Sequence, residues 1–326
     1  MRPFTHAVFV SVALVMGVLT TPVTAQDMHS FPEKPVKMVV PFPAGGATDA
    51  VARLIGQQLS ALWKQPVVID NRPGAGTVIG TDAVARAPAD GYTVGMVISA
   101  HTINPSLRPN LPYDTLKDFA PVSQIGVQHL VIAAHPKFEA NNIPELIALA
   151  KRNPGKMTYA SPGSGTAMHL SMELLNVTAG IQITHIPYKG GAPAQQDVIG
   201  GQVPLLLDVY HSSAPLIKSG RLKSIAMLSP KRIAAAPDIP AIAETVPAVA
   251  AVGTIGIVAP AGMPKALVAK MSADIAKVVL SKDVSGKLAE MGVDPVGSTP
   301  EAYDAVIRAE IIKWAPVVKA SGAKAD

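Results

Sequence analysis

Short apolar runs alternate with longer helical patterns along this chain, and that alternation limits the folds it can adopt. Residues 36–42 form an apolar run of the length of a buried strand. Residues 48–63 follow, with apolar side chains spaced three and four positions apart, as in an amphipathic helix. Strand patterns at 66–69 and 92–99 then flank a helical pattern at 77–87. Successive strand–helix–strand units of this kind predict a parallel sheet with helices on both faces.

A second set of the same units follows in the middle of the chain. Its strand and helix patterns occupy residues 157–160, 166–178, 181–186, 203–209 and 222–228. Two long stretches rich in Val, Ile and Ala, 122–134 and 248–259, are each expected to run as an extended strand between the two sets. Helical patterns at 265–280 and 300–320 are expected to return to the first set. We therefore predict an α/β fold of two lobes, each a mostly parallel sheet flanked by helices, joined by a two-stranded hinge.

The predicted lobe boundaries lie where the hinge strands pass from one lobe to the other. Lobe 1 would comprise residues 26–127 plus 253–326, and lobe 2 residues 128–252. Hydrophobic residues make up 48% of the chain, which is enough to fill two cores. The chain contains no cysteine, and this excludes disulfides, thiolate metal sites and a thiol nucleophile.

The first 25 residues have the three-part layout of a secretory signal. A short basic start is followed by an uncharged apolar run at 7–19, and residues 23–25 supply the small side chains that a signal peptidase reads. The apolar run is shorter than the roughly 20 residues that cross a bilayer. An uncleaved anchor helix is the alternative. We predict export of the protein with cleavage near Ala25 and Gln26.

Charge and histidine spacing argue against several classes of function. The formal net charge is +5, and the basic residues are scattered rather than gathered into a block, so nucleic acid is not an expected partner. No second apolar stretch reaches ~18 residues, and a soluble mature protein is therefore expected. The histidines show neither of the spacings typical of metal sites. We expect no metal and no cofactor.

A glycine loop joins the first strand pattern to the first helix pattern. It reads Pro41-Phe42-Pro43-Ala44-Gly45-Gly46-Ala47-Thr48-Asp49. Glycines let the backbone approach a ligand closely, and the unpaired N–H groups at the following helix start attract an anion. A plain turn in which Thr48 or Asp49 caps the helix is the alternative for this loop taken alone.

A second loop of the same layout lies at the corresponding place in the second set of units. It reads Ser161-Pro162-Gly163-Ser164-Gly165-Thr166-Ala167-Met168-His169. Open α/β sheets bind ligands beyond the carboxyl ends of their strands, where both loops are expected. Two such loops, one in each lobe, predict a ligand trap that closes across a cleft.

Motifs of catalysis are mostly absent. Around Ser164 a nucleophile elbow would need glycines at 162 and 166, where the chain has Pro162 and Thr166. Residues 74–80 are one residue too long for a dinucleotide fingerprint and are expected to form a turn and a helix start. Asp49 could pair with His101 or His169 in a hydrolytic site, but their separation is not given by the sequence.

A series of motifs, in order along nearly the whole mature chain, resembles the periplasmic solute-binding components of tripartite tricarboxylate transporters, the Bug family. The motifs are FPEKPV (31–36), VPFPAGGATD (40–49), NRPGAG (71–76), DGYT (90–93), INPSL (103–107), LPYD (111–114), KDFAPV (117–122), YAS (159–161), PYKG (187–190) and APAG (259–262). The resemblance implies a two-lobed periplasmic-binding-protein-like fold that closes on a small carboxylate held against the two glycine loops. It also implies a periplasmic, monomeric protein that contacts membrane transporter subunits transiently.

The resemblance carries particular residues over to the predicted site. From the two loops these are Gly45, Gly46, Ala47, Thr48, Ser161, Ser164, Gly165 and Thr166. Further residues expected to shape the pocket are Phe42, Ala44, Asp49, His101, Asn104, His169, Asp208 and Tyr210. The chain departs from the family pattern at Pro162, where Ala is more usual, and at residues 253–256, which lack the aromatic residue that often precedes the glycine there.

The predicted function is capture of a small organic carboxylate for delivery to a tripartite tricarboxylate-type transporter, without catalysis. One alternative is a periplasmic serine hydrolase that uses Ser164 or Ser161 with a histidine. Another is a binding protein that reports a carboxylate to a membrane receptor. The sequence does not name the ligand.

Overall fold

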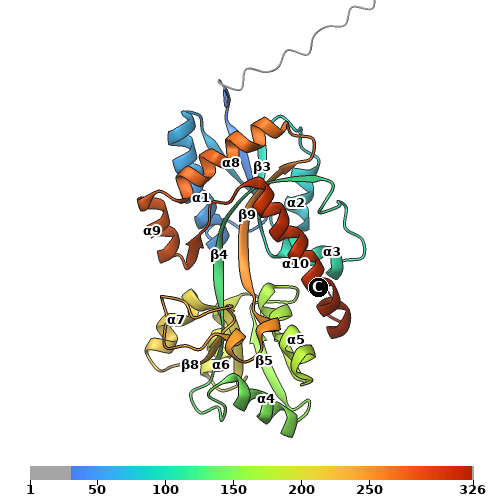
Figure 1. Cartoon of the computed structure of the whole chain (residues 1–326), viewed down its shortest axis with the longest axis vertical. Coiled ribbons are helices and arrows are strands. Elements are labelled where there is room, and N and C mark those ends of the chain that lie inside the picture. The colour runs from blue at the N-terminus through green and yellow to red at the C-terminus, as the bar shows by residue number, and fades with distance from the viewer. Residues whose placement is uncertain (1–30, 325–326) are drawn as a thin grey trace, which may run out of the picture. The chain divides into compact units, whose positions relative to one another are not determined.

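The computed structural model describes residues 31–324 (Figure 1). The predicted signal at 1–25 lies outside the described residues. In the described part, ten strands form one continuous hydrogen-bonded sheet. This sheet serves two lobes, which we call the β1 lobe and the β5 lobe after a central strand of each.

The β1 lobe contains three parallel strands in the order β2-β1-β3, followed by β9 and β4, which run antiparallel to their neighbours. Its strands are β1 (Val36–Val40), β2 (Val67–Asn71), β3 (Thr93–Ile98), β9 (Val252–Pro260) and β10 (Val293–Pro295). Its helices are α1 (Ala47–Trp63), α2 (Val78–Ala85), α3 (Ala100–Leu107), α8 (Lys265–Val279), α9 (Lys282–Glu290) and α10 (Pro300–Ser321).

The β5 lobe has the same plan, with β7, β5 and β6 parallel to one another. Its strands are β5 (Met157–Ser161), β6 (Ile183–Pro187), β7 (Leu205–Val209) and β8 (Lys223–Met227). Its helices are α4 (Ile143–Arg152), α5 (Ala167–Ala179), α6 (Gly191–Ile199) and α7 (Tyr210–Lys218). The parallel strands of each lobe are the short apolar runs of the sequence, and the antiparallel pairs involve strands that arrive from the other lobe or from the C-terminal segment.

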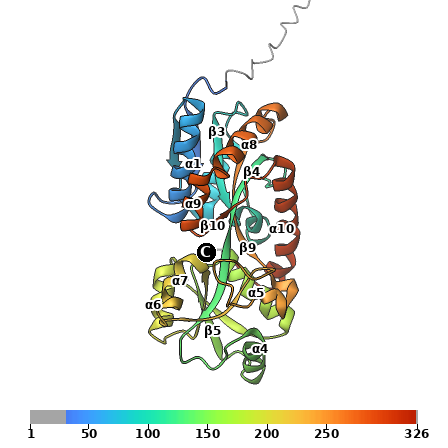
Figure 2. The same cartoon turned by 60° about the vertical axis from the view of Figure 1, so that its left-hand side comes forward.

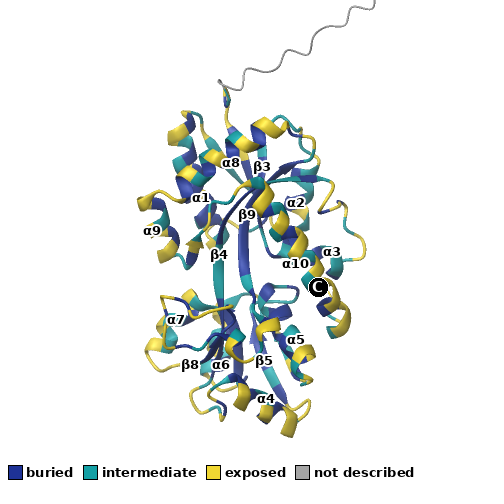
Figure 3. Ribbon diagram, in the orientation of Figure 1, coloured by how far each residue is buried: buried dark blue, intermediate teal, exposed yellow. Residues whose placement is uncertain are grey.

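One long strand, β4 (Phe119–Ala134), belongs to both lobes. Up to His129 it pairs with β9, and from Leu130 onward it pairs with β7 and β8 (Figures 1 and 2). The two strands are largely buried where they lie side by side (Figure 3). These are the two stretches that the sequence predicts as connecting strands. The predicted lobe boundaries near 127 and 253 remain a prediction.

Helix α10 contacts both lobes, whereas the sequence predicts only its return to the first. Its N-terminal half covers the β1 lobe, and its C-terminal half reaches α5 of the β5 lobe (Figure 2). The apolar cluster there joins residues of α3, α5 and α10, including Ile103, Leu107, Leu170, Trp314 and Val317. Because these side chains are buried together, α10 holds α3 and α5 against each other beside the crossing strands.

Candidate functional site

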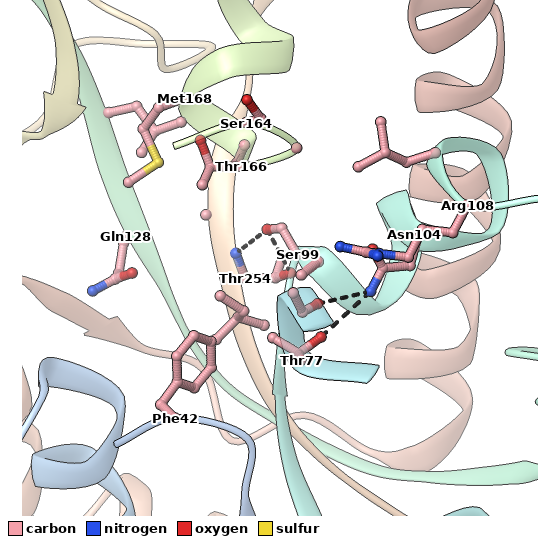
Figure 4. A pocket seen from close by; sticks show the side chains of 18 residues that line it. Phe42, Thr77, Ser99, Asn104, Arg108, Gln128, Ser164, Thr166, Met168 and Thr254 are labelled. Atoms are coloured by element: carbon pink, nitrogen blue, oxygen red, sulfur yellow. Dashed lines mark hydrogen bonds between the residues drawn. The ribbon is translucent and has the colours of Figure 1, made fainter. Parts of the chain in front are cut away.

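A cavity of about 180 Å³ lies between the two lobes, next to the crossing of β4 and β9 (Figure 4). The β1 lobe, together with β9, contributes Phe42, Gly76, Thr77, Ile98, Ser99, Ala100, Asn104, Leu107, Arg108, Gly253 and Thr254. The crossing strand β4 contributes Gln128 and Leu130. The β5 lobe contributes Ser164, Gly165, Thr166, Ala167 and Met168. The starts of α3 and α5 therefore both lie in the cavity wall.

The start of α3 is tied to β9 by hydroxyl groups. The Ser99 hydroxyl lies 3.1 Å from the Thr254 hydroxyl and accepts a hydrogen bond of 2.9 Å from the Thr254 backbone N–H (Figure 4). One turn later, the Asn104 amide donates to the Gly76 carbonyl at 3.1 Å. These bonds fix the helix start and the 75–77 segment against each other, so this wall of the cavity is ordered before a ligand binds.

The segment before α2 has an unusual backbone. Ala75, Gly76 and Thr77 have φ values of 45°, 58° and 82°, all in the left-handed region. Only glycine adopts that region without cost, so Ala75 and Thr77 are strained. Such strain concentrates at binding and catalytic sites, and Gly76 and Thr77 line the cavity. A single 3₁₀ turn at 75–77 leads into α2, which begins at Val78, so the prediction of a turn and a helix start at 74–80 is confirmed. The sequence did not assign the segment to the site.

The second glycine loop is held by its own side chains. The Thr166 hydroxyl donates to the Gly163 carbonyl at 2.8 Å and accepts from the His169 N–H at 3.2 Å, which caps α5. The Gly165 N–H donates to His169 Nδ1 at 3.0 Å. A Cβ atom on Gly165 would lie 2.3 Å from Cδ2 of Leu107. The φ of Gly165 is +73°, in the left-handed region, and this together with the Leu107 contact favours glycine where the loop meets the opposite lobe.

Five of the predicted site residues line this cavity: Phe42, Asn104, Ser164, Gly165 and Thr166. Residues 44–47 of the first loop are exposed to solvent and are not part of the cavity wall. Thr48, at the start of α1, is also outside it. For these first-loop residues, a ligand contact remains a prediction.

Asp49 holds the first loop in place. Its carboxylate accepts hydrogen bonds from Arg53 Nε at 2.8 Å, from the Gly45 N–H at 2.8 Å and from Asn71 at 2.9 Å. The Arg53 hydrogen bond is the main cause that lowers the pKa of Asp49 to about 2. The side chain is buried among these partners, which occupy its oxygens, and it does not line the cavity.

The predicted histidines lie behind the cavity wall. His101 is buried against Tyr113 and Phe119, and burial lowers its pKa to about 4. His169 stacks on His185 with ring centroids 3.9 Å apart. His185 Nε2 lies 2.7 Å from the Ser161 hydroxyl, and burial lowers the pKa of His185 to about 3. Ser161 is fully buried and does not line the cavity.

Asp208 and Tyr210 lie away from this cavity. The Asp208 carboxylate accepts hydrogen bonds from Gln195, Ser212 and Ser213. Tyr210 lines a different hollow, together with His129 and Asp294. In that hollow His129 Nε2 lies 2.6 Å from Asp294 Oδ2. Within residues 31–324, no cluster of His, Asp and Glu has the arrangement of a metal site.

Several cavity residues were missed by the sequence analysis. Arg108 directly follows the INPSL motif at 103–107, and Gln128 and Thr254 lie on the crossing strands. The Thr254 hydroxyl also lies 3.4 Å from Glu310 of α10, and this carboxylate accepts a bond of 2.8 Å from Thr102. Burial raises the pKa of Glu310 to about 7. Two signals were available in the sequence, namely the position of Arg108 next to a quoted motif and the departure from the family pattern at 253–256, which includes Thr254.

Comparison with known proteins gives a consistent result. Protein BugT of Bordetella pertussis is 38% identical over 309 residues, which is 94% of this chain and 94% of BugT. A solved structure of an R. palustris protein with adipate has 34% identity and a TM-score of 0.79, and covers 90% of this chain and 99% of its own.

A second solved structure is MatC from Rhodopseudomonas palustris with bound malate. It has 30% identity and a TM-score of 0.75, and covers 88% of this chain and 100% of its own. Residues 51–323 of this chain match the family described as "Tripartite tricarboxylate transporter family receptor". This match spans most of the chain and both lobes, and the chain therefore belongs to the tripartite tricarboxylate transporter receptor family, to which its sequence motifs point.

Proposed function

We propose that this protein captures a small organic carboxylate in the periplasm and delivers it to a tripartite tricarboxylate-type membrane transporter. The observation that carries the proposal is the cavity between the lobes, in which the starts of α3 and α5 meet. Helix N-termini attract carboxylates through unpaired N–H groups and a partial positive charge. The relatives with adipate and malate support the same class of ligand.

Closure of the two lobes would bury the carboxylate in this cavity, with 26–127 plus 253–326 as one lobe and 128–252 as the other. The ligand would enter from solvent and meet Ser164 and Thr166 on one side and Ser99 on the other. The transporter contact would be transient, and the binding protein would act as a monomer. The alternative in which the protein reports a carboxylate to a membrane receptor would use the same cavity. It differs from delivery to a transporter only in the membrane protein that the binding protein contacts.

The serine hydrolase alternative has a candidate pair in Ser161 and His185, 2.7 Å apart. Three observations disfavour it. Ser161 is fully buried and does not line the cavity, so a substrate there would not reach its hydroxyl. The low pKa of His185 makes it a weak base. Among the described residues, Ser164 has no hydrogen bond to an imidazole.

A thermal-shift screen of the purified mature protein against di-, tri- and monocarboxylates tests the proposal. A ligand at 100 times its Kd should add about 2.7 kcal/mol to the free energy of unfolding. The corresponding amides and alcohols serve as controls and should give no shift. A protein that responds to the neutral controls as strongly as to the acids would contradict carboxylate capture.

Two serine variants separate binding from catalysis. Ser164→Ala should weaken binding of the acid found in the screen by about 10- to 150-fold, because a hydrogen bond to a charged group is lost. Ser161→Ala should leave the affinity nearly unchanged. The acid should be recovered chemically intact after long incubation. Turnover of an ester or amide that disappears in either variant would favour the hydrolase instead.

A further inference from the structure

The charge of the cavity wall comes from one residue. Among the described residues that line the cavity, Arg108 carries the only charged side chain, and the others are apolar, hydroxyl or amide. Arg108 directly follows α3, and Figure 4 shows its guanidinium beside Asn104. A cation in an otherwise uncharged cavity favours a ligand group with a negative charge over a neutral or positive one.

The Arg108 guanidinium has no anionic partner in the protein. Within residues 31–324, no hydrogen bond or ion pair to it is present, and its Nε atom is buried without a partner. By contrast, Arg53 and Arg232 each form an ion pair, with a carboxylate oxygen 2.8 Å from the arginine Nε. An arginine that is partly buried without such a partner is costly unless a ligand supplies the anion.

The strained segment beside Arg108 makes room for it. A Cβ atom on Gly76 would lie 2.5 Å from Nη2 of Arg108, so any other residue would push the guanidinium aside. Gly76 and its neighbours Ala75 and Thr77 all have φ values in the left-handed region. The strained backbone conformation thus occurs where the Arg108 guanidinium lies against Gly76.

We propose that the Arg108 guanidinium binds a second anionic group of the ligand and selects diacids over monoacids. The inference rests on the proposed carboxylate-binding function, with one carboxylate near Ser164 at the start of α5 and the second at Arg108. The planar fork of arginine matches a carboxylate in a bidentate arrangement, which makes it selective for geometry as well as charge. The predicted ligand class is therefore the short dicarboxylates.

Matched pairs of ligands and variants test this selectivity. Calorimetry would compare succinate, glutarate and adipate with their monoamides, which keep the length but lose one charge. The wild-type protein should bind at least one diacid about 10- to 150-fold more tightly than its monoamide. Arg108→Gln should bring that ratio close to one and keep the affinity for the monoamide.

Lys324→Gln is the control variant. Lys324 and Arg108 both line a wider, more open hollow next to the cavity, but Lys324 does not line the cavity itself. Its removal lowers the local positive charge equally and should leave the diacid-to-monoamide ratio unchanged. If both variants reduce the ratio equally, the effect comes from the general field and the assignment of Arg108 is wrong.

Other results also decide the question. A wild-type ratio near one for all three pairs, or an undiminished ratio in Arg108→Gln, would overturn the inference and leave carboxylate capture intact. Binding of none of the six compounds would overturn the inference, whereas the proposed function would fall only if the wider carboxylate screen also gave no shift. If Arg108→Gln does not fold, Arg108→Lys replaces it, since lysine keeps the charge and loses the fork. The ratio should then be reduced, and a full ratio would reject the bidentate contact.

Discussion

In the second glycine loop, the Thr166 hydroxyl and the Gly165 N–H form hydrogen bonds that stabilise the loop itself. Thr166 uses its hydroxyl both as a donor to Gly163 and as the cap of α5, and Gly165 gives its N–H to His169. From sequence alone these groups were expected to face a carboxylate. Their observed bonds assign them first to the shape of the loop, and the proposed carboxylate contact therefore falls to Ser164 and the backbone at the start of α5.

Thr166→Val therefore should lower both stability and affinity. Loss of a helix cap costs about 1 kcal/mol of the free energy of unfolding, and a misplaced loop should weaken carboxylate binding by roughly 2- to 12-fold. Thr299→Val is the matched control, because Thr299 caps α10 in the same way by accepting from the Ala302 N–H. It should lose similar stability in urea denaturation and keep its affinity in calorimetry. Equal affinity in both variants would show that the loop geometry does not matter for binding.

At the scale of elements, α10 connects the site to the rest of the protein. It buries Trp314 against α3 and α5, and its Glu310 reaches Thr102 of α3 and Thr254 of β9. Thr254 lines the cavity, so a helix far along the chain supports the wall that a ligand would contact. Lys313 lies on the same helix, and burial lowers its pKa while the charge of Glu310 opposes that shift.

This contact predicts a pH dependence of stability. Burial raises the pKa of Glu310 from 4.5 to about 7 in the folded protein, so the folded state binds a proton more tightly than the unfolded state. Its contribution is fully present below pH 4.5 and is lost as the pH rises through about 7. Glu310→Gln removes the titration, and its stability should fall less than that of the wild type between pH 5 and 8.

The measurement is urea denaturation at several pH values. The comparison variant is Glu290→Gln, which changes an exposed glutamate at the end of α9. It should follow the pH profile of the wild type. Parallel profiles for the wild type and Glu310→Gln would show that Glu310 is ionised normally in the folded protein.

At the scale of the whole molecule, the two lobes are linked by β4, by β9 and by α10 rather than by a flexible linker. β4 changes partners at residues 129–130, from β9 to β7 and β8. Closure by bending at this point would move the start of α5 relative to the start of α3, and α10 would have to adapt because it packs on both. Each helix in residues 31–324 is too short or too polar to span a lipid bilayer.

The predicted export of the chain can be tested at its N-terminus. The layout of the first 25 residues predicts removal of the segment before Gln26. Intact-mass spectrometry of protein from the periplasmic fraction should give a chain that begins at Gln26. Periplasmic protein that still carries Met1 would contradict cleavage, and protein retained in the membrane fraction would favour the anchor helix.

Local sequence patterns were enough to locate most of the strands, the longer helices and the two glycine loops. Apolar periodicity located the parallel strands and the main helices to within a few residues, as for α1 at 47–63 against the predicted 48–63, because local spacing decides which face a segment can bury. Glycines followed by a capping residue marked the start of α5 for the same local reason.

The set of side chains that share the cavity depends on tertiary packing. Arg108, Gln128 and Thr254 come from three distant segments, and they meet because β4 crosses β9 beside α3. Asp49 was expected at the site, yet its partners Arg53 and Asn71 draw its carboxylate into the base of the first loop. Asp49 and Arg53 lie four residues apart on α1, so their spacing alone allowed the pair. The Asn71 contact and the meeting of the three cavity residues depend instead on how strands far apart in the chain are aligned, which local spacing does not specify.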